Sequence, residues 1–358
     1  MSNWEQYIDQ TLEPLAGQRC ALLDAPYYGN MGDVLIWEAM ERFIARHGLT
    51  CLYRCSSQTF RYRQIDEDVT IFLVGGGNFG DLWRGLQDFR NKIIQLYPHN
   101  RIIIFPQSVY YQDLQLLQSD AEIFASHPDV HICARDEQSY QILCEHFTHN
   151  HILLLPDMAL YLSLIHSVTS TGKTLLIKRM DKESVEFNDI TNAITDTLDW
   201  PTMHVSADEH QSFTKVQKNS HRLLRCICRY MPSILRVEIY HLITHSLRSL
   251  LCNAETPIRT KWVYCYLEYQ YLFYINQKSK GRLSEIIDDW MHTYFRSLSV
   301  QYAESFIANY DIVYSTRLHG GILAALMGKQ TFLIDNSYGK ISGVYNKWMQ
   351  KIPNVSLI

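Results

Sequence analysis

The stretch Val69–Asp81, which reads VTIFLVGGGNFGD, decides the fold class. Val69 to Val74 form a short apolar run, which is typical of a strand buried on both faces of a parallel sheet. Glycines and polar residues follow directly, and this is the composition of a turn. A buried strand that ends in a glycine-rich turn predicts an α/β protein, in which ligands bind beyond the carboxyl ends of the strands.

Other apolar runs of the same kind recur along the chain. The predicted strands, besides Val69–Val74, are Ala21–Leu23, Arg101–Phe105, Val130–Cys133, Ile152–Leu155, Thr174–Ile177, Ile312–Tyr314 and Thr331–Ile334. Segments of helical length lie between strands, for example Val34–His47 and Leu86–Leu96, with apolar residues three and four apart. This alternation predicts an α/β fold made of two Rossmann-like, doubly wound domains.

The length of 358 residues favours two domains, because one hydrophobic core seldom organises so long a chain. The stretch SVTSTG at 167–172 has the composition of a linker. We therefore place the domains at 1–170 and 171–358. Within the second domain, residues of about 212–299 are aromatic and basic and lack alternating strand and turn signals, so we expect a helical insert there.

The composition argues against several classes of protein. Lysine and arginine number 33 against 37 acidic residues, and the net charge of -4 offers no general attraction to nucleic acid. The nine cysteines include no CxxC pair, which favours reduced thiols in the cytoplasm over a disulfide framework. Glu5, Asp9 and Glu13 stand where a signal peptide needs basic and then apolar residues, so we expect no export.

Two other sets of polar residues have simple structural interpretations. Arg135 and Asp136 can be a strand end followed by a helix cap, with Ser139 nearby. We predict no protein-held metal, because ligand spacing is absent among the scattered residues His127, His131, His146, His149 and His151.

Two glycine-rich turns share one pattern. Gly29–Asp33 reads GNMGD and Gly77–Asp81 reads GNFGD, and each follows a predicted strand. Glycines let a ligand approach the backbone, and the helix after the first turn favours an anion or a hydroxyl-rich group at its amino terminus. Because the turns match, we expect them to form one site. The alternatives are that Asp33 is only a helix cap and that the second turn is a structural loop.

A third turn, STRLHGG at Ser315–Gly321, leads from a predicted strand into the predicted helix Gly321–Met327. Arg317 and His319 are two residues apart, so an extended turn projects both side chains the same way. Arginine offers a planar fork for a carboxylate or phosphate, and histidine is suited to proton transfer near neutral pH. The turn therefore predicts an anion site with a proton-transfer group beside it.

Seven short motifs follow one another in a recognisable order. They are GNMGD at 29–33, GGGN at 75–78, FPQS at 105–108, ARD at 134–136, LPD at 155–157, STRLHG at 315–320 and DNSYGK at 335–340. In this order they resemble the polysaccharide pyruvyltransferase family, and the last is most similar to its exopolysaccharide ketal-pyruvate branch. The resemblance covers residues 25–348 except the expected insert, and the combination is far more specific than any single motif.

The resemblance implies a fold similar to that of B-type glycosyltransferases, phosphoenolpyruvate as the donor and no further cofactor. Arg317 and His319 match the family's donor-site residues, and Arg179 is similar to a further donor-site arginine. Lys178 replaces the family's apolar neighbour, which leaves open which of these two cations points inward. The expected donor side comprises Arg179, Ser315, Arg317, His319 and Lys340. The expected acceptor side comprises Asn30, Asp33, Asn78 and Asp81.

The chemistry of the donor explains these residue types. Phosphoenolpyruvate carries a carboxylate and a phosphate, so its pocket needs several fixed cations, which Arg179, Arg317 and Lys340 can supply. Ketal formation begins with protonation of the methylene carbon. One sugar hydroxyl then attacks, phosphate leaves and a second hydroxyl closes the ring. His319 is the expected acid, and a carboxyl group such as Asp157 is the alternative.

The expected insert carries a basic segment. Residues 215–248 hold seven lysines or arginines against the single acidic residue Glu238, and Pro232 is expected to divide the segment into two helices. Such a segment either packs on its own domain, which we favour, or lies on an anionic membrane, where a lipid-linked sugar acceptor would be found. We therefore expect a cytoplasmic protein that is at most peripheral to the membrane.

Two rival functions remain. A nucleotide-sugar glycosyltransferase can have the same architecture, because fold does not fix function. A non-catalytic scaffold for polysaccharide assembly is the rival from another class, and Arg317, His319 and Lys340 argue against it.

Overall fold

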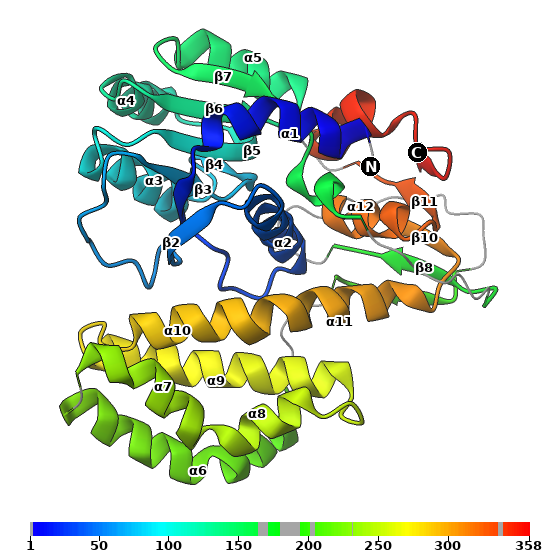
Figure 1. The fold of residues 1–358 in the computed structure, drawn as a ribbon. Helices are drawn as coiled ribbons and strands as arrows, with labels where there is room; N and C mark the ends of the chain where they lie inside the picture. Colours follow the sequence, from blue (N-terminus) through cyan, green and yellow to red (C-terminus); the bar gives the residue numbers. More distant parts are fainter. Residues whose placement is uncertain (1–2, 164–170, 180–193, 201–204, 231, 336–338) are drawn as a thin grey trace. The chain divides into compact units, whose positions relative to one another are not determined.

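The computed structural model describes residues 3–163, 171–179, 194–200, 205–230, 232–335 and 339–358 (Figure 1). The predicted linker at 167–170 lies outside these residues, as do Asn336, Ser337 and Tyr338 of the DNSYGK motif. The chain forms two compact units. The first comprises Met1–Ser57, Gln64–Pro201 and Glu304–Ile358, and the second comprises Gln58–Arg63 and Thr202–Ala303. Both β-sheets belong to the first unit.

The first sheet consists of parallel strands in the order β2-β1-β3-β5-β6-β7, with β4 paired to β5. The strands are β1 Arg19–Leu23, β2 Thr50–Arg54, β3 Val69–Leu73, β4 Gly76–Gly80, β5 Ile102–Tyr110, β6 Val130–Ala134 and β7 His151–Leu154. Every residue of β3 and β6 is buried, as expected of strands covered on both faces. The five strands predicted in the first half are all present.

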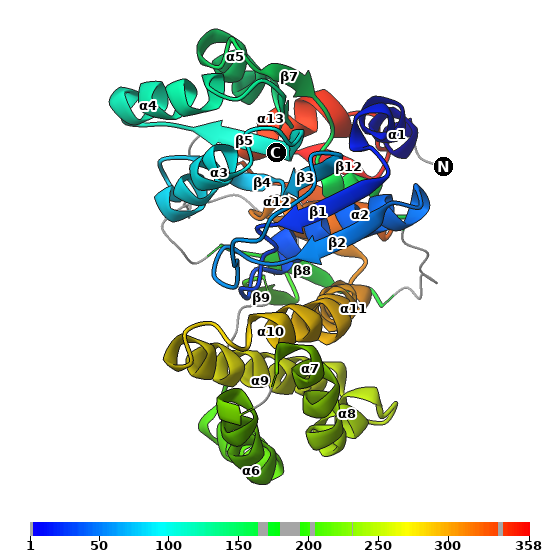
Figure 2. The ribbon, with the colours of Figure 1, turned by 60° about the vertical axis from the view of Figure 1, so that its left-hand side comes forward.

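Helices cover both faces of this sheet. They are α1 Asn3–Ala16, α2 Met31–Arg46, α3 Arg84–Leu96, α4 Leu114–Ala125, α5 Glu137–His146 and the short 3₁₀ helix η1 Met158–Tyr161. Helices α1 and α2 lie on one face, and α3, α4 and α5 lie on the other (Figures 1 and 2). The predicted α/β fold class is thereby confirmed.

The second sheet consists of parallel strands in the order β12-β11-β10-β8-β9. The strands are β8 Thr174–Ile177, β9 Asp196–Leu198, β10 Ile312–Ser315, β11 Gln330–Leu333 and β12 Val355–Leu357. The helices that follow its strands are α12 Leu318–Leu326, α13 Lys340–Val344 and the π-helical turn η3 Tyr345–Met349. The three strands predicted from apolar runs are again present.

The stretch Gly76–Gly80 was predicted as a turn, and it is instead strand β4. It pairs with the second half of β5, which continues through Pro106 to Tyr110. Gly80 has a φ of 115°, and a Cβ at this position would collide with the carbonyl oxygen of Tyr110. Only glycine allows so close an approach of the two strands.

The second unit is helical, as predicted for the insert. Its helices are α6 Ala207–Tyr230, α7 Ser233–Ile243, α8 His245–Cys252, α9 Ile258–Lys278, α10 Ser284–Trp290 and the π-helical turn η2 Met291–Phe295, and α11 Arg296–Ala308 begins in it. Pro232 separates α6 from α7, as predicted. Glu268 is buried and accepts hydrogen bonds from Tyr240 and Gln217. Within the described residues, no helix has both the length and the apolar character needed to cross a membrane.

Candidate active site

The candidate site lies where the strand order reverses in each sheet. In the first sheet the chain passes from β1 to the edge strand β2 and then to β3 on the other side of β1. In the second sheet it passes from β8 to the edge strand β9 and later to β10 on the other side of β8. Ligands of open α/β sheets bind beyond the carboxyl ends of the strands at such points. Asn30 follows β1, Gly77 follows β3, Arg179 follows β8 and Arg317 follows β10.

Side chains from both sheets surround one small cavity with mostly polar walls. The segment after β1 contributes Asn30, Gly32 and Asp33. The second sheet contributes four basic residues, which are Arg179, Arg317, His319 and Lys340. The structure therefore brings together the basic residues that the sequence predicted as the donor side.

The imidazole of His319 rests against Gly32. His319 is in the first turn of α12, and a Cβ added to Gly32 would collide with its Nδ1 atom. The other ring nitrogen, Nε2, lies 3.3 Å from Oδ2 of Asp157. Gly32 of the GNMGD turn thus leaves space for the His319 side chain, which belongs to the second sheet.

Asp157 is fully buried and is held as an anion. Its Oδ2 atom lies 2.5 Å from Nη1 of Arg135, and Oδ1 accepts a hydrogen bond from the N–H of Ala159. Burial alone would raise the pKa of Asp157, but the charges of His319 and Arg135 and these hydrogen bonds lower the pKa well below its ordinary value. An ionised carboxylate has no proton to give, which favours His319 over Asp157 as the proposed acid. Asp157 instead orients His319.

Arg135 has a larger part in this region than the sequence suggested. Asp136 does cap α5 as predicted, accepting from the N–H of Ser139 at 2.8 Å. The Arg135 side chain is buried, with Nε donating to Ser108 and Nη1 to Asp157. Its Nη2 atom has no hydrogen-bond partner among the described residues and lies close to Gly77. The ARD motif was the signal that could have identified this buried cation.

Lys340 approaches the site from the start of α13. Gly339, at a φ of 76°, turns the chain into this helix. A Cβ added to Gly77 would collide with Nζ of Lys340. The glycine of the second turn therefore makes room for Lys340, just as Gly32 does for His319.

Arg317 and Arg179 both line the cavity but differ in their contacts. The guanidinium of Arg317 donates from Nε and Nη2 to the carboxylate of Asp199, at 3.0 and 2.9 Å. Asp199 follows β9, a strand too short to stand out in the sequence. The backbone N–H of Arg179 donates to Oγ1 of Thr316, which ties the ends of β8 and β10 together. Lys178 is exposed and does not line the cavity, so Arg179 is the inward cation.

Ser315 was predicted to contact the donor, and the structure places it behind the turn. It is fully buried and does not line the cavity. Its hydroxyl donates to the carbonyl oxygen of Arg317 at 2.7 Å and accepts from the N–H of Arg317 at 3.1 Å. These bonds shape the turn that presents Arg317 and His319.

A second, larger cavity of about 330 Å³ adjoins the first. Asn30, Asp33, Arg179 and Lys340 line both cavities. The remaining walls of the larger cavity are Tyr28, Gly77, Asn78, Trp83 and Leu86. Three of the four residues predicted for the acceptor side, which are Asn30, Asp33 and Asn78, therefore face this cavity.

Asp81 is the exception among those four residues. Its Oδ2 atom accepts hydrogen bonds from the N–H groups of Gln112 and Asp113, each at 2.7 Å. It lines neither cavity. The carboxylate of Asp81, which ends the second of the two matching Gly-Asn-x-Gly-Asp (GNxGD) stretches, therefore stabilises the loop after β5.

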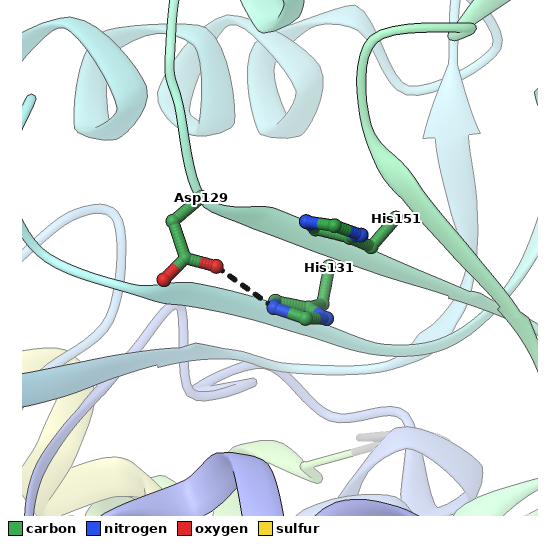
Figure 3. Close-up of side chains that lie close together, drawn as sticks. All are labelled: Asp129, His131 and His151. Carbon is green, nitrogen blue, oxygen red and sulfur yellow. Dashed lines mark hydrogen bonds and ion pairs between the residues drawn. The ribbon is translucent and has the colours of Figure 1, made fainter.

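Two of the histidines predicted to be scattered, His131 and His151, lie close together with Asp129 beside them (Figure 3). The register of β6 and β7 sets His131 opposite His151, and their rings stack with centroids 4.5 Å apart. Nε2 of His131 lies 2.8 Å from Oδ1 of Asp129, and Oδ2 of Asp129 accepts from Arg101 at 2.9 Å. Candidate ligand atoms of Asp129, His131 and His151 lie within 4.8 Å of one another. Sequence spacing missed this group because strand register is not visible in it.

Comparison with known proteins identifies the family. The family model described as polysaccharide pyruvyl transferase matches residues 30–338. The chain belongs to this family. Its relatives include the Bacillus subtilis protein named "Putative pyruvyl transferase EpsO", which is 32% identical over 94% of this chain and 87% of its own length. Another is "Pyruvyl transferase 1" of Schizosaccharomyces pombe, 27% identical over 54% of this chain and 51% of its own.

The fold also matches a solved structure. The crystal structure of a functionally uncharacterised protein from Klebsiella pneumoniae aligns with a TM-score of 0.56. The alignment covers 100% of this chain and 99% of that one, at 18% sequence identity. At this identity the match concerns the fold alone.

Proposed function

We propose that the protein transfers a pyruvyl group from phosphoenolpyruvate to two hydroxyls of a sugar in a surface polysaccharide or its precursor. The observation that carries this proposal is the set of basic residues around the smaller cavity, Arg179, Arg317, His319 and Lys340. Phosphoenolpyruvate presents a carboxylate and a phosphate on a three-carbon frame, and several fixed cations suit such a ligand. Membership of the polysaccharide pyruvyl transferase family supports the same reaction class.

The atoms of the reaction balance with the donor and the sugar alone. A proton from the His319 imidazole adds to the methylene carbon, and one sugar hydroxyl adds to the neighbouring carbon. The bond from that carbon to the phosphate oxygen then breaks, and the second hydroxyl closes the ring. The sugar gives up two protons, of which one restores His319 and the other leaves on phosphate. The products are a cyclic ketal and inorganic phosphate.

The contacts around the cavity suggest how the residues divide this work. Lys340 and Arg179 bind the anionic groups of the donor, and the buried guanidinium of Arg135 adds positive charge near Gly77. Asp199 holds Arg317 in a two-point ion pair, which fixes the plane of its guanidinium. Asp157 orients His319 for proton transfer. In this proposal the second sheet supplies most of the donor side, and the first sheet supplies the acceptor side, as in B-type glycosyltransferases.

The experiment that tests the proposal is thermal unfolding with phosphoenolpyruvate and, in parallel, with nucleotide sugars. A ligand that binds only the folded protein stabilises it by about 2.7 kcal/mol at a hundredfold excess over its Kd. We expect phosphoenolpyruvate to raise the melting temperature and nucleotide sugars to leave it unchanged. The Arg317→Ala variant should lose most of the shift. Stabilisation by a nucleotide sugar alone would favour the glycosyltransferase alternative.

We also propose that the protein works in the cytoplasm and that α6, besides packing on its own unit, offers a basic face for peripheral contact with anionic membranes, where a lipid-linked acceptor would be found. Support comes from α6, whose buried side chains include Phe213, Gln217 and Leu224. Its exposed residues include Leu223 and the basic group Lys215, Lys218, Arg222 and Arg225. This helix both packs on its own unit and presents charge to solvent. Replacing Lys218, Arg222 and Arg225 by Glu should abolish sedimentation with phosphatidylglycerol vesicles, and unchanged sedimentation would leave only the packing role.

A further inference from the structure

We propose that the larger cavity holds the sugar acceptor and that Asp33 is the base that takes the proton from the attacking hydroxyl. This inference rests on the proposed pyruvyl transfer. It goes further by assigning the acceptor to one cavity, the larger one, and by naming a catalytic base that the first sheet supplies. The argument depends on the position of Asp33, on its hydrogen bonds and on the aromatic walls beside it.

The position of Asp33 suits a group that meets both substrates. Four residues line both cavities, and they are Asn30, Asp33, Arg179 and Lys340. A neutral amide does not take up a proton at physiological pH, and arginine and lysine already carry one. Asp33 is therefore the residue of this boundary that can accept a proton from a hydroxyl while that hydroxyl attacks the donor.

The hydrogen bonds of Asp33 leave one oxygen for the sugar. Its Oδ2 atom accepts from the hydroxyl of Tyr28 at 3.0 Å and from Nδ2 of Asn30 at 2.9 Å. Its Oδ1 atom lies 3.7 Å from where a Cβ of Gly76 would be, and it receives no hydrogen bond from the described residues. A carboxylate oriented through one oxygen and open at the other is arranged to accept a hydrogen bond from a ligand.

The walls of the larger cavity suit a carbohydrate. Tyr28 and Trp83 are large aromatic residues, yet they are 38% and 46% exposed. Both line the cavity beside Asn78, whose polar side chain also faces it. Aromatic rings with a polar edge suit ligands that are part apolar and part hydrated, as the two faces and the hydroxyls of a sugar ring are. A volume of about 330 Å³ is within the range of small-molecule sites.

A second carboxyl group, Asp24, lies behind Asp33. Asp24 follows β1, is buried, and has a φ of 69°, a strained conformation that is found often at functional sites. Its Oδ2 atom lies 3.7 Å from Nη2 of the buried residue Arg90. Burial, with a contribution from the charge of Asp33, raises the pKa of Asp24 to about 7 against the charge of Arg90. A protonated Asp24 carries no charge and therefore does not repel a negative charge on Asp33.

The proton transfer takes place in one step with carbon–oxygen bond formation. The sugar oxygen attacks the central carbon of phosphoenolpyruvate while its proton moves to Oδ1 of Asp33. His319, which lines the smaller cavity, supplies the proton for the methylene carbon. The proton on Asp33 later leaves with phosphate, which restores the carboxylate. The titratable or charged groups around Asp33 are Tyr28, Asp24, Arg179, Lys340 and His319.

The test compares Asp33→Asn with Asp81→Asn, since the two residues end the same GNxGD pattern. Phosphate release from phosphoenolpyruvate is measured with the methyl glycosides of galactose, glucose and mannose as acceptor probes. We expect Asp33→Asn to slow turnover by a factor of about 10² to 10⁴ and to lose the low-pH limb of the rate profile. Stabilisation by phosphoenolpyruvate should persist or increase, because a negative charge beside an anion is removed. Asp81→Asn should turn over within a few-fold of the parent.

The outcomes separate the inference from the proposed function. A parent that phosphoenolpyruvate does not stabilise contradicts the proposed function itself. A parent that binds the donor but uses none of the glycosides overturns the assignment of the larger cavity. An Asp33→Asn enzyme with the parent's rate and pH profile overturns the role as base. Trp83→Ala provides a second variant at the surface, and we expect it to raise the KM for the glycoside at least tenfold without changing stabilisation by phosphoenolpyruvate.

Discussion

The two GNxGD stretches, Gly29–Asp33 and Gly77–Asp81, have one pattern and two structures. In the first, Asn30 caps α2 and Asp33 faces both cavities. In the second, the chain continues as β4, and Asp81 binds backbone N–H groups of the loop after β5. The difference arises from the neighbours, since the second stretch pairs with β5 and the first has no strand beside it to pair with among the described residues. A repeated motif therefore does not guarantee a repeated role.

The largest effect on turnover is expected at His319, whose side chain packs against Gly32 of the first GNxGD stretch. In His319→Gln a hydrogen-bonding group of similar reach remains, but the titratable proton is lost. We expect turnover to fall by a factor of about 10² to 10⁴. Phosphoenolpyruvate should still raise the melting temperature, and the titration near neutral pH should disappear from the rate profile. A variant with nearly the parent's rate and an unchanged profile would show that another group moves the proton.

The residues that follow β1 and β3 provide the next comparison, because Asp24 follows one strand and the apolar Val74 the other. Asp24 has a folded-state pKa of about 7 and an ordinary value of 3.8. The folded state therefore keeps a proton that the unfolded state releases. The tighter proton binding by Asp24 therefore adds to the stability of the folded state. This stabilisation is complete below about pH 4 and is lost as the pH rises through 7.

Asp24→Asn removes this dependence while keeping a residue that tolerates the left-handed conformation. Relative to the parent, its free energy of unfolding should rise with pH, by on the order of 4 kcal/mol between pH 4 and pH 8. Urea unfolding at the two pH values measures it. Val74→Ala is the matched variant. Its free energy of unfolding should be lower than that of the parent by an amount that does not change with pH. A constant difference for Asp24→Asn would mean that Asp24 has the same pKa in the folded and the unfolded protein.

The fourth residues of the two patterns, Gly32 and Gly80, should respond in opposite ways to alanine. A Cβ on Gly32 meets the ring and the Cβ of His319 and displaces this side chain, so Gly32→Ala should lose activity by a factor of about 10² and lose less stability than Gly80→Ala. A Cβ on Gly80 meets the backbone of Tyr110 at a positive φ, so Gly80→Ala should lose roughly 1 to 3 kcal/mol of stability. Activity per folded molecule and the melting temperature are the two measurements. Equal loss of stability in both variants would contradict the distinction.

The smallest effect is expected at Asn30. Its Oδ1 atom accepts from the N–H of Gly32 as the cap of α2, and Asn30→Ala should cost about 1 kcal/mol. Asn78→Ala should cost more, because the buried guanidinium of Arg90 loses the side-chain acceptor Oδ1 of Asn78 and keeps only the backbone carbonyl. Thermal unfolding of the two variants checks the order. The reverse order would show that Arg90 finds other acceptors.

The strands of the fold were predictable where they are buried, because buried strands are rich in apolar residues. The strands β3 and β8 could be located because they are apolar at nearly every position. Strand β4 could not be located, because its glycines allow close approach to β5 and give it the composition of a turn. The edge strands β2 and β9 were missed because their residues are largely exposed and vary in character.

The site residues were predictable where the residue type itself points to one function, as arginine and lysine point to anion binding. Arg317, His319 and Lys340 stood out as polar groups after strands, and the structure brings them to one cavity. The partners Asp157 and Asp199 were not assigned to them, because a carboxylate's partner depends on which segments pack together. Their distances in sequence, 162 residues from His319 and 118 from Arg317, show why local pattern could not connect them.

The contacts at Gly32 and Gly77 have a consequence for recombination among relatives. His319 and Lys340 belong to the second sheet, yet the space they occupy is provided by glycines of the first. A chimaera that joins residues 1–163 of one relative to the remainder of another can therefore be active only if positions 32 and 77 remain without a side chain. Under the proposed division of the site, acceptor specificity should be exchangeable between relatives, whereas the absence of a side chain at positions 32 and 77 must be kept.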